Sequence, residues 1–551
     1  MKLKPIAIGL VALSLAACGG GGDSTSTSGG TATQTPAAQT VSGVVATGLP
    51  LSGAAVNMTC AAGSGATTTA ADGSYSVAVK GAVLPCVLTA TSSDSKVILH
   101  SVVPGTGASS SNATAHITPL TELLVAQLGG QDPAQFVSAF GPTTAVSAAA
   151  VSSAQSALVS VLKNAGFDPS SIGDFIAGAI AAGSHQGYDA ILDTLQSTIA
   201  SANTSLSELS AAIANSTGST TAAASTLGTI LAPANADCTS LKSGDHRLIK
   251  LSDGSAKLAT VDATKLTVAI SGTTYQLTKG ATSCDFSLND PNSTRVLVAK
   301  SGLAVWTSGS GATGTIALSM PAQTMDPSVI NGAYNYALIS GAPQNQFGTH
   351  GYTKGVTTSA TNCLSGYGSC AVDTVTPYGH LVATPDGGAD WIDDGSQAGT
   401  AQFHAVGFRN AQGNILWIAT VLGQGGGVGV FVPQTTLPLP AVGTTSAFWQ
   451  RIVDNTTGLS AVTEDNHTIT AQNGTTVTRT FASDSHSDVL SFNDPFNGMR
   501  HRAANACTTS TGAAQNCSST LQLPLGGMTL AWSGSGSNYR VSISVTKPGS
   551  L

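Results

Sequence analysis

Apolar and polar residues alternate with a period of two near the start of the chain. In residues 41–105, Val56, Met58 and Cys60 are separated by polar positions, and Asp72-Gly73 has the composition of a hairpin turn. Such alternation is typical of a strand with one buried face, because successive side chains point to opposite sides of a sheet. We therefore predict a small β-sandwich over residues 41–105.

The period changes to 3.6 residues in the segment 112–232. Thr118 can cap a helix that begins at Pro119, and Ser205 and Glu208 have the spacing of a capping box. Three apolar stripes mark further helices: Val151, Ala154, Leu158 and Val161; Ile172, Phe175, Ile176 and Ile180; and Tyr188, Ile191, Leu192, Leu195 and Ile199. The opposite faces carry Ser, Thr and Asn, which favours core packing over membrane adsorption or binding of a partner helix. We predict a helical domain over 112–232.

Short alternating strands return at residue 236 and continue to the end. Residues 468–480, for example, fold back at Asn473-Gly474. Repeated turns without a long helix are typical of an antiparallel sandwich or an up-and-down barrel. We divide this part into 236–325 and 326–551, and whether it is one domain or two stays open. The predicted fold class is therefore multidomain and mainly β: a small β-sandwich, an α-helical region, then a large antiparallel β-sandwich or barrel.

Charge and composition exclude some partners. Charged residues make up 9% of the chain and apolar residues 42%, which is too hydrophobic for a disordered protein. The chain has 21 basic and 28 acidic residues, so it lacks the basic footprint that phosphate backbones require. We therefore expect no nucleic acid partner, and a length of 551 residues indicates several domains.

The first 18 residues have the pattern of an export signal. Lys2 and Lys4 precede an apolar stretch that is too short to span a bilayer and that ends in Leu15-Ala16-Ala17-Cys18. These last four residues resemble the bacterial lipobox, in which a peptidase cuts before the cysteine and the thiol carries a lipid. The resemblance implies a lipid anchor on Cys18. Because Gly19 replaces the aspartate linked to inner-membrane retention, it also implies the outer membrane of a Gram-negative cell. Residues 19–40 are predicted to form a flexible tether.

The predicted sandwich resembles the carboxypeptidase regulatory-like module, a small transthyretin-like β-sandwich, in the residues VSGVVATGLPLSGAAV and TAADGSYSVAV. This module is an accessory domain found beside many unrelated activities, so the resemblance implies a fold and not a reaction. A zinc carboxypeptidase would need a His-x-x-Glu pair. None of the three glutamates, Glu122, Glu208 and Glu464, follows a histidine at that spacing.

Eight of the nine cysteines remain once Cys18 is assigned to the lipid. An even number of cysteines in an exported protein indicates disulfides, although eight cysteines allow 105 pairings. Their positions suggest neighbouring pairs: Cys60 with Cys86, Cys238 with Cys284, Cys363 with Cys370, and Cys507 with Cys517. Zinc is not expected, because Cys-x-x-Cys spacing occurs nowhere in the chain.

The sequence contains no recognised catalytic motif: neither Gly-x-Ser-x-Gly nor His-Glu-x-x-His nor a phosphate-binding loop occurs. We therefore assign no catalytic residue and no cofactor. Two acidic clusters remain open. The first, at Asp390, Asp393 and Asp394, fits paired carboxylates, a calcium site or a solvated turn. The second, at Asp484, His486 and Asp488, would place three metal ligands on one face of a strand, or it is a polar loop.

All five tryptophans lie in the second half of the chain. Trp391 and Trp449 have polar neighbours and are candidates to line a ligand cleft, with partial burial as the alternative. The sequence favours a lipid-anchored binding protein that takes a glycan, small molecule or protein, and the sparse charge favours a neutral or weakly polar ligand. A hydrolase with an unrecognised site and a purely structural envelope protein are the alternatives.

Overall fold

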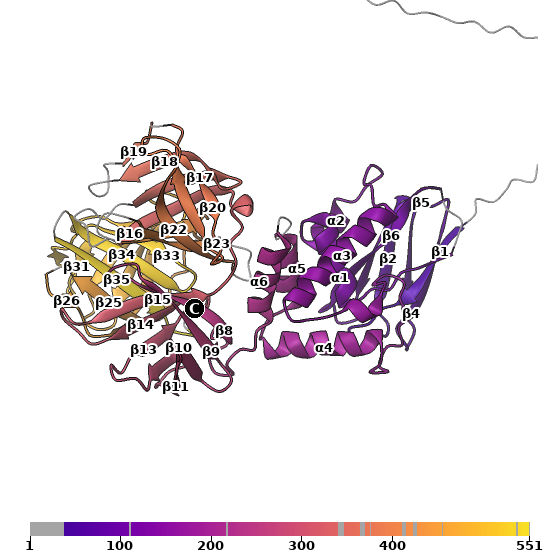
Figure 1. Cartoon of the computed structure of the whole chain (residues 1–551), viewed down its shortest axis with the longest axis horizontal. Helices are drawn as coiled ribbons and strands as arrows, with labels where there is room; N and C mark the ends of the chain where they lie inside the picture. Colours follow the sequence, from indigo (N-terminus) through magenta and orange to yellow (C-terminus); the bar gives the residue numbers. More distant parts are fainter. Residues whose placement is uncertain are drawn as a thin grey trace, which may run out of the picture.

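The structure is a computed structural model, and it describes residues 38–108, 112–215, 219–339, 347–363, 370–374, 376–409, 415–422, 427–454, 456–535 and 538–549. The predicted signal segment, Cys18 and nearly all of the predicted tether lie outside the described residues. Figure 1 shows a sandwich with helices at one end of the molecule and a group of β-sheets at the other. The prediction of a mainly β, multidomain protein is confirmed.

The first part is a sandwich of two small sheets. One sheet has the order β4-β1-β7 and the other β3-β2-β5-β6. The strands are β1 (Ala38–Val44), β2 (Ala55–Ala62), β3 (Ser64–Thr68), β4 (Ser74–Lys80), β5 (Val83–Thr91), β6 (Ile98–Ala108) and β7 (Asn112–Thr114). The Asp72-Gly73 turn does not form the predicted hairpin, because β3 and β4 belong to different sheets and the chain crosses between them there.

Cys60 and Cys86 are directly opposite each other on the neighbouring strands β2 and β5. Their disulfide therefore lies within one sheet and does not bridge the two sheets of the sandwich. Both cysteines belong to the apolar core, but alternation along a strand does not reveal which strand is its neighbour.

The described residues next form six α-helices: α1 (Pro119–Gly129), α2 (Pro133–Ser138), α3 (Ala148–Asn164), α4 (Tyr188–Ser201), α5 (Leu206–Ala214) and α6 (Thr220–Leu231). Thr118 caps α1 as expected, and it also forms a capping box with Thr121. Ser205 and Glu208 form the expected capping box on α5. The stripe from Ile172 to Ile180 is not a helix: a 3₁₀ turn, η1 (Ser170–Ile172), ends at Gly173, whose φ of 77° breaks the helical path. The helices and the sandwich share one apolar core. No helix in the described ranges is long and apolar enough to cross a membrane.

The next eight strands close into a barrel, here called barrel 1, in the order β10-β11-β12-β13-β14-β15-β8-β9. They are β8 (Gly244–Lys250), β9 (Ala256–Asp262), β10 (Thr267–Ile270), β11 (Thr273–Lys279), β12 (Asp285–Leu288), β13 (Arg295–Val298), β14 (Ala304–Ser308) and β15 (Thr315–Pro321). The short turn η2 (Pro327–Val329) then leads into the second barrel.

Barrel 2 is a nine-stranded sheet in which β17 also pairs with β18, so that eight strands form a ring and β19 extends it. Its strands are β16 (Gly332–Ile339), β17 (Phe347–Thr353), β18 (Val356–Cys363), β19 (Cys370–Val372), β20 (Gly379–Ala383), β21 (Ala389–Asp393), β22 (Thr400–Arg409), β23 (Ile415–Val421) and β24 (Val428–Pro433).

Barrel 3 closes in the same way through a pairing of β28 with β29. Its strands are β25 (Thr445–Asp454), β26 (Gly458–Leu459), β27 (Thr463–Asn473), β28 (Thr476–Phe481), β29 (Ser487–Phe492), β30 (Arg500–Arg502), β31 (Cys507–Thr508), β32 (Ala514–Gln515), β33 (Thr520–Pro524), β34 (Met528–Ser535) and β35 (Asn538–Thr546). Residues 326–551 therefore contain two barrels where the sequence suggested one region, because turn signals locate strands but do not show which strands close a ring.

The three barrels pack against one another through apolar outer faces. Val305 of barrel 1, Ile418 of barrel 2 and Ile543 of barrel 3 belong to one buried cluster. Each barrel also has a separate interior, because alternate residues of a strand point into the ring and out of it. The outer faces hold the β half of the protein together, which leaves the interiors free to differ.

Candidate functional site

The interior of barrel 3 is a cavity of about 530 Å³. On β25, Ser446, Phe448 and Gln450 line this cavity, whereas Trp449 between them points outward and is 0% exposed in the core shared by the barrels. Trp449 therefore does not line a ligand cleft, and that prediction was wrong. Polar neighbours in the sequence suggested exposure, but on a barrel strand they mark the cavity side.

Charged side chains gather inside this barrel. Asp488 accepts two hydrogen bonds from Arg479, from Nε at 2.9 Å and from Nη2 at 2.7 Å, and Nη1 of Arg502 lies 3.4 Å from Asp488 Oδ2. Burial alone would raise the pKa of Asp488, but the two guanidinium groups outweigh it and hold the pKa below its usual range. Asp488 is therefore an anion that two arginines surround.

Arg500 lines the same cavity, and no acidic residue in the described ranges pairs with it. Its guanidinium lies over the ring of Phe492, 5.4 Å from the ring centroid, and its Nε has no hydrogen-bond partner among the described residues. Burial, together with the positive charge of Arg479, lowers the pKa of Arg500 to about 9, so the group is still charged at pH 7. A charge enclosed in this way is costly unless an anion or polar group meets it.

The rest of the lining combines hydroxyl groups with aromatic and aliphatic surface. Hydroxyl groups of Thr520, Ser542 and Ser544 face the cavity, and residues 437–440, which join barrel 2 to barrel 3, line it as well. His467 is another inward group. Burial and then Arg479 lower its pKa to about 4, so this imidazole is neutral at pH 7.

The interior of barrel 2 is filled by side chains, unlike the interior of barrel 3. Tyr334, Tyr352 and Trp417 pack as an aromatic cluster inside it, and the free space beside them is only about 20 Å³. Trp391 belongs to this packing: its Nε1 donates to Thr357 Oγ1 at 3.0 Å, and its ring contacts Phe403 edge-on. Trp391 therefore borders a core void and not the cleft that the sequence suggested, because a ligand cannot fit there.

The acidic residues near Trp391 do not converge on one point. Asp390 pairs with His404 at 2.8 Å and Asp394 with His380 at 2.8 Å, whereas Asp393 accepts backbone N–H groups of the following turn. Only the stretch from Asp393 onward matches the turn alternative, because Asp390 lies within strand β21. Two of the three carboxylates are each held by a histidine.

The predicted metal trio at residues 484–488 is not formed. Asp484 and His486 pair with each other in an exposed turn. Asp488 lies within strand β29, where Arg479 and Arg502 hold it. The prediction assumed a continuous strand from residue 484. The positive φ of 60° at Ser485 breaks that strand, so the side chains do not share a face.

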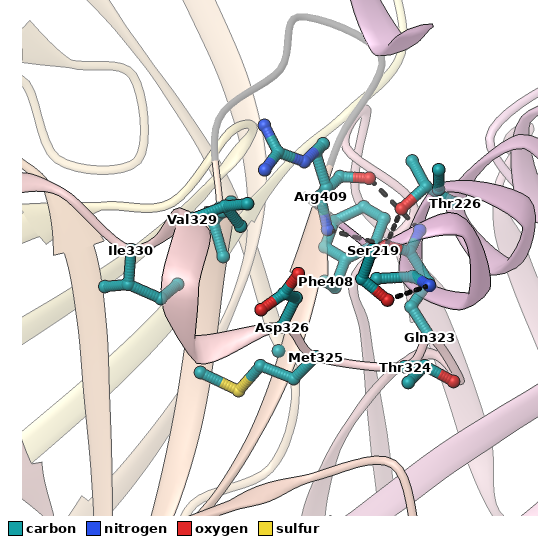
Figure 2. Close-up of a pocket in the computed structure, with 14 residues that line it drawn as sticks. Ser219, Thr226, Gln323, Thr324, Met325, Asp326, Val329, Ile330, Phe408 and Arg409 are labelled. Atoms are coloured by element: carbon teal, nitrogen blue, oxygen red, sulfur yellow. Dashed lines mark hydrogen bonds between the residues drawn. The ribbon is translucent and has the colours of Figure 1, made fainter. Parts of the chain in front are cut away.

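A smaller space of about 30 Å³ lies at the junction of the helices with barrel 2. Figure 2 shows Gln323 between α6 and β22. Gln323 Oε1 accepts from Thr226 Oγ1 at 3.3 Å and from the backbone N–H of Arg409 at 2.8 Å, and Nε2 donates to the Arg409 carbonyl at 3.1 Å. A space of this size holds about one water molecule, so this is a joint between two parts of the protein and not a ligand site.

Sequence reasoning missed the arginines of barrel 3. The available signal was Arg500-His501-Arg502, in which two arginines two residues apart share one face of a strand. Arg479 lies in the alternating strand β28, on the same side as the buried Val477. The sparse overall charge suggested a neutral ligand, but the structure concentrates four arginines, Arg479, Arg500, Arg502 and Arg540, around one cavity.

No protein-family model matches the chain, and no curated protein matches it. Among solved structures, transferrin binding protein B from serogroup B Neisseria meningitidis is 8% identical with a TM-score of 0.19, over 57% of this chain and 68% of that one. A putative outer membrane protein from Bacteroides fragilis is 13% identical with a TM-score of 0.14, over 41% of this chain and 100% of that one. A transferrin binding protein B mutant from Haemophilus parasuis is 9% identical with a TM-score of 0.14, over 55% and 66%. Likenesses this slight carry no argument about this chain.

Proposed function

We propose that this chain is a binding protein of the bacterial envelope that holds a small organic anion inside barrel 3. The observation that carries the proposal is Arg500, a guanidinium that faces an internal cavity without an acidic partner among the described residues. An anion in the cavity would supply the missing partner. The volume of about 530 Å³ lies in the usual range of small-molecule sites.

The rest of the lining supports an anionic group attached to a partly apolar body. Arg479 and Arg502 share the single carboxylate of Asp488, so the positive charge is not neutralised within the ring. Guanidinium groups bind carboxylate, phosphate and sulfonate groups with two parallel hydrogen bonds. The phenyl rings of Phe448, Phe481 and Phe492 offer surface for the remainder of such a ligand.

Two fluorescent probes that share an aromatic system test the charge preference. The first, 1-anilinonaphthalene-8-sulfonate, carries a sulfonate, and the second, N-phenyl-1-naphthylamine, is neutral. In the full chain, Arg500→Gln should weaken binding of the sulfonate probe at least about tenfold, the effect of losing a hydrogen bond to a charged group. Binding of the neutral probe should stay nearly unchanged, since the aromatic contacts remain.

Two further variants separate the cavity from the surface. Ala531 lines the cavity, so Ala531→Trp should block both probes, whereas Lys257→Gln removes an exposed positive charge of barrel 1 and should affect neither. Equal affinity of the sulfonate probe for the parent and a folded Arg500→Gln variant would overturn the proposal. If Arg500→Gln does not fold, sulfonate binding that survives Ala531→Trp would overturn it as well.

The location in the envelope is part of the proposal and rests on the sequence. Residues 15–18 resemble a lipobox, and the glycine-rich residues after Cys18 would tether the folded part to the lipid. The expected result is an outer-membrane lipoprotein whose barrels stand away from the lipid surface.

A further inference from the structure

A second group of titratable side chains lies far from barrel 3, at the start of helix α4. Asp189 and Asp193 are four residues apart on this helix and so share a face, and His185 lies in the turn before it. One ligand atom from each of the three residues lies within 4.8 Å of the others. Among the described residues, these are the three histidine, cysteine or acidic side chains whose ligand atoms lie close enough together to hold one metal ion.

The individual contacts hold the three side chains together. His185 Nδ1 lies 2.6 Å from Asp193 Oδ2, and the backbone N–H of His185 donates to Asp189 Oδ2 at 2.7 Å. Gly48 leaves room for the second carboxylate, because a Cβ at that position would lie 2.4 Å from Asp193 Oδ1. The backbone therefore holds Asp189 through the His185 N–H and leaves space for Asp193 beside Gly48.

The second carboxylate oxygen of Asp189, Oδ1, indicates that a ligand is missing. Asp189 is 0% exposed, and Oδ1 has no hydrogen-bond partner within the part of the chain that the structure describes. No lysine or arginine among the described residues forms an ion pair with either aspartate. A buried carboxylate oxygen without a partner is costly, and a bound cation would remove that cost.

We propose that His185, Asp189 and Asp193 form a site for one divalent metal ion of the zinc class. One imidazole nitrogen and two carboxylate oxygens are a donor set that zinc and its neighbours accept, and three protein ligands leave one position for water. Calcium and magnesium prefer oxygen ligands alone, so the imidazole argues against them. The two carboxylates balance the charge of the ion.

Titration of Zn²⁺ into the full chain, after removal of metal with a chelator, tests this site by calorimetry. One ion should bind, and its binding should raise the melting temperature. His185→Ala and Asp193→Asn should each weaken binding at least roughly 10- to 100-fold, the loss that even an outer-shell partner causes. His486→Ala removes a histidine that also pairs with an aspartate in a turn, and it should leave the affinity unchanged.

Asp189→Asn separates a metal ligand from a residue that only holds the turn before α4. Asparagine can still accept the His185 N–H, so a residue that only fixes this turn would tolerate the change with its zinc affinity intact. Loss of zinc binding without a fall in the melting temperature of the metal-free protein supports the site. Zinc binding that survives both Asp189→Asn and Asp193→Asn, or no binding below millimolar concentration, would overturn it.

Discussion

Arg479 and Asp488 are directly opposite each other on β28 and β29, and their two hydrogen bonds join the strands whose pairing closes barrel 3. The side chains of both residues are buried. The ion pair therefore has two roles, because it holds one seam of the ring and it also sets the charge that faces the cavity.

Asp488→Asn should destabilise barrel 3 and at the same time favour anions. Removing one partner of a buried ion pair leaves the other charge uncompensated and costs roughly 3 kcal/mol. Denaturant unfolding of the full chain measures that loss, and Asp484→Asn, in the exposed turn nearby, is the control with little expected effect. Binding of 1-anilinonaphthalene-8-sulfonate to the Asp488→Asn variant should become tighter, since no carboxylate competes for Arg479. Weaker sulfonate binding would contradict this assignment of the cavity charge.

Stability should fall as the pH is lowered from about 6.5 to about 4. Burial lowers the pKa of His350 to about 4, and burial with Arg479 lowers that of His467 to about 4. In the unfolded chain these imidazoles take up protons near their ordinary value of about 6.5. Within this window the unfolded state binds more protons than the folded state, so acid favours unfolding. Melting temperatures across the window should depend less steeply on pH in a His350→Gln, His467→Gln double variant, and an unchanged slope would argue against the assignment.

Trp449→Ala should lower stability more than Trp391→Ala. Trp449 is fully buried where the barrels meet, and replacing such a side chain by alanine costs roughly 3 to 5 kcal/mol. Trp391 is partly exposed at the edge of its cluster, so less packing is lost. Thermal unfolding of both variants in parallel gives the comparison. A larger loss for Trp391→Ala would contradict the positions described for these side chains.

The four disulfides join the neighbouring cysteines: Cys60 with Cys86, Cys238 with Cys284, Cys363 with Cys370, and Cys507 with Cys517. Loop-entropy arguments give about 3.5 kcal/mol for the Cys60 to Cys86 loop, whose ends are 26 residues apart, and about 2.4 kcal/mol for the Cys363 to Cys370 loop, where the separation is 7. Replacing Cys60 and Cys86 by alanine should therefore lower the free energy of unfolding more than replacing Cys363 and Cys370. Non-reducing peptide mapping checks the pairing itself, and a peptide that links Cys60 to a cysteine beyond residue 230 would contradict it.

Cys18 should carry the lipid in the mature protein. The intact mass of the membrane-extracted chain should correspond to a start at Cys18 plus a lipid modification, and Cys18→Ser should release the protein from the membrane fraction. A mature N-terminus elsewhere, or an unmodified thiol at Cys18, would disprove the assignment.

Local features of the fold could be predicted, and non-local ones could not. Thr118 and Pro119 start α1 because a helix cap involves only neighbouring residues, and the turn at Asn473-Gly474 depends on four residues. The closure of barrel 3 depends on a pairing of β28 with β29 and on many other contacts between distant strands.

The charge of the cavity was hidden for a related reason. Arg500 and Arg502 share a face of β30, but only the closed ring decides that this face is the inside. His185, Asp189 and Asp193 follow one another at intervals of four residues, which the sequence shows. The prediction for this segment used only its apolar stripe, so these polar residues were not predicted to form a site. In both cases the sequence shows the spacing of the residues. It does not show whether their side chains are buried, and burial is what makes these groups candidates for binding.

The shared outer core has a consequence for the order in which the protein is made. Val541, Ile543 and Val545 of β35 complete the layer against which barrels 1 and 2 pack, and β35 is synthesised after both. Until β35 has been synthesised, the walls of the first two barrels present bare apolar surface, which chaperones would have to shield. The β half is therefore assembled only after the last strand arrives, and a nonsense mutation that removes only the final strand should send all three barrels to proteolysis.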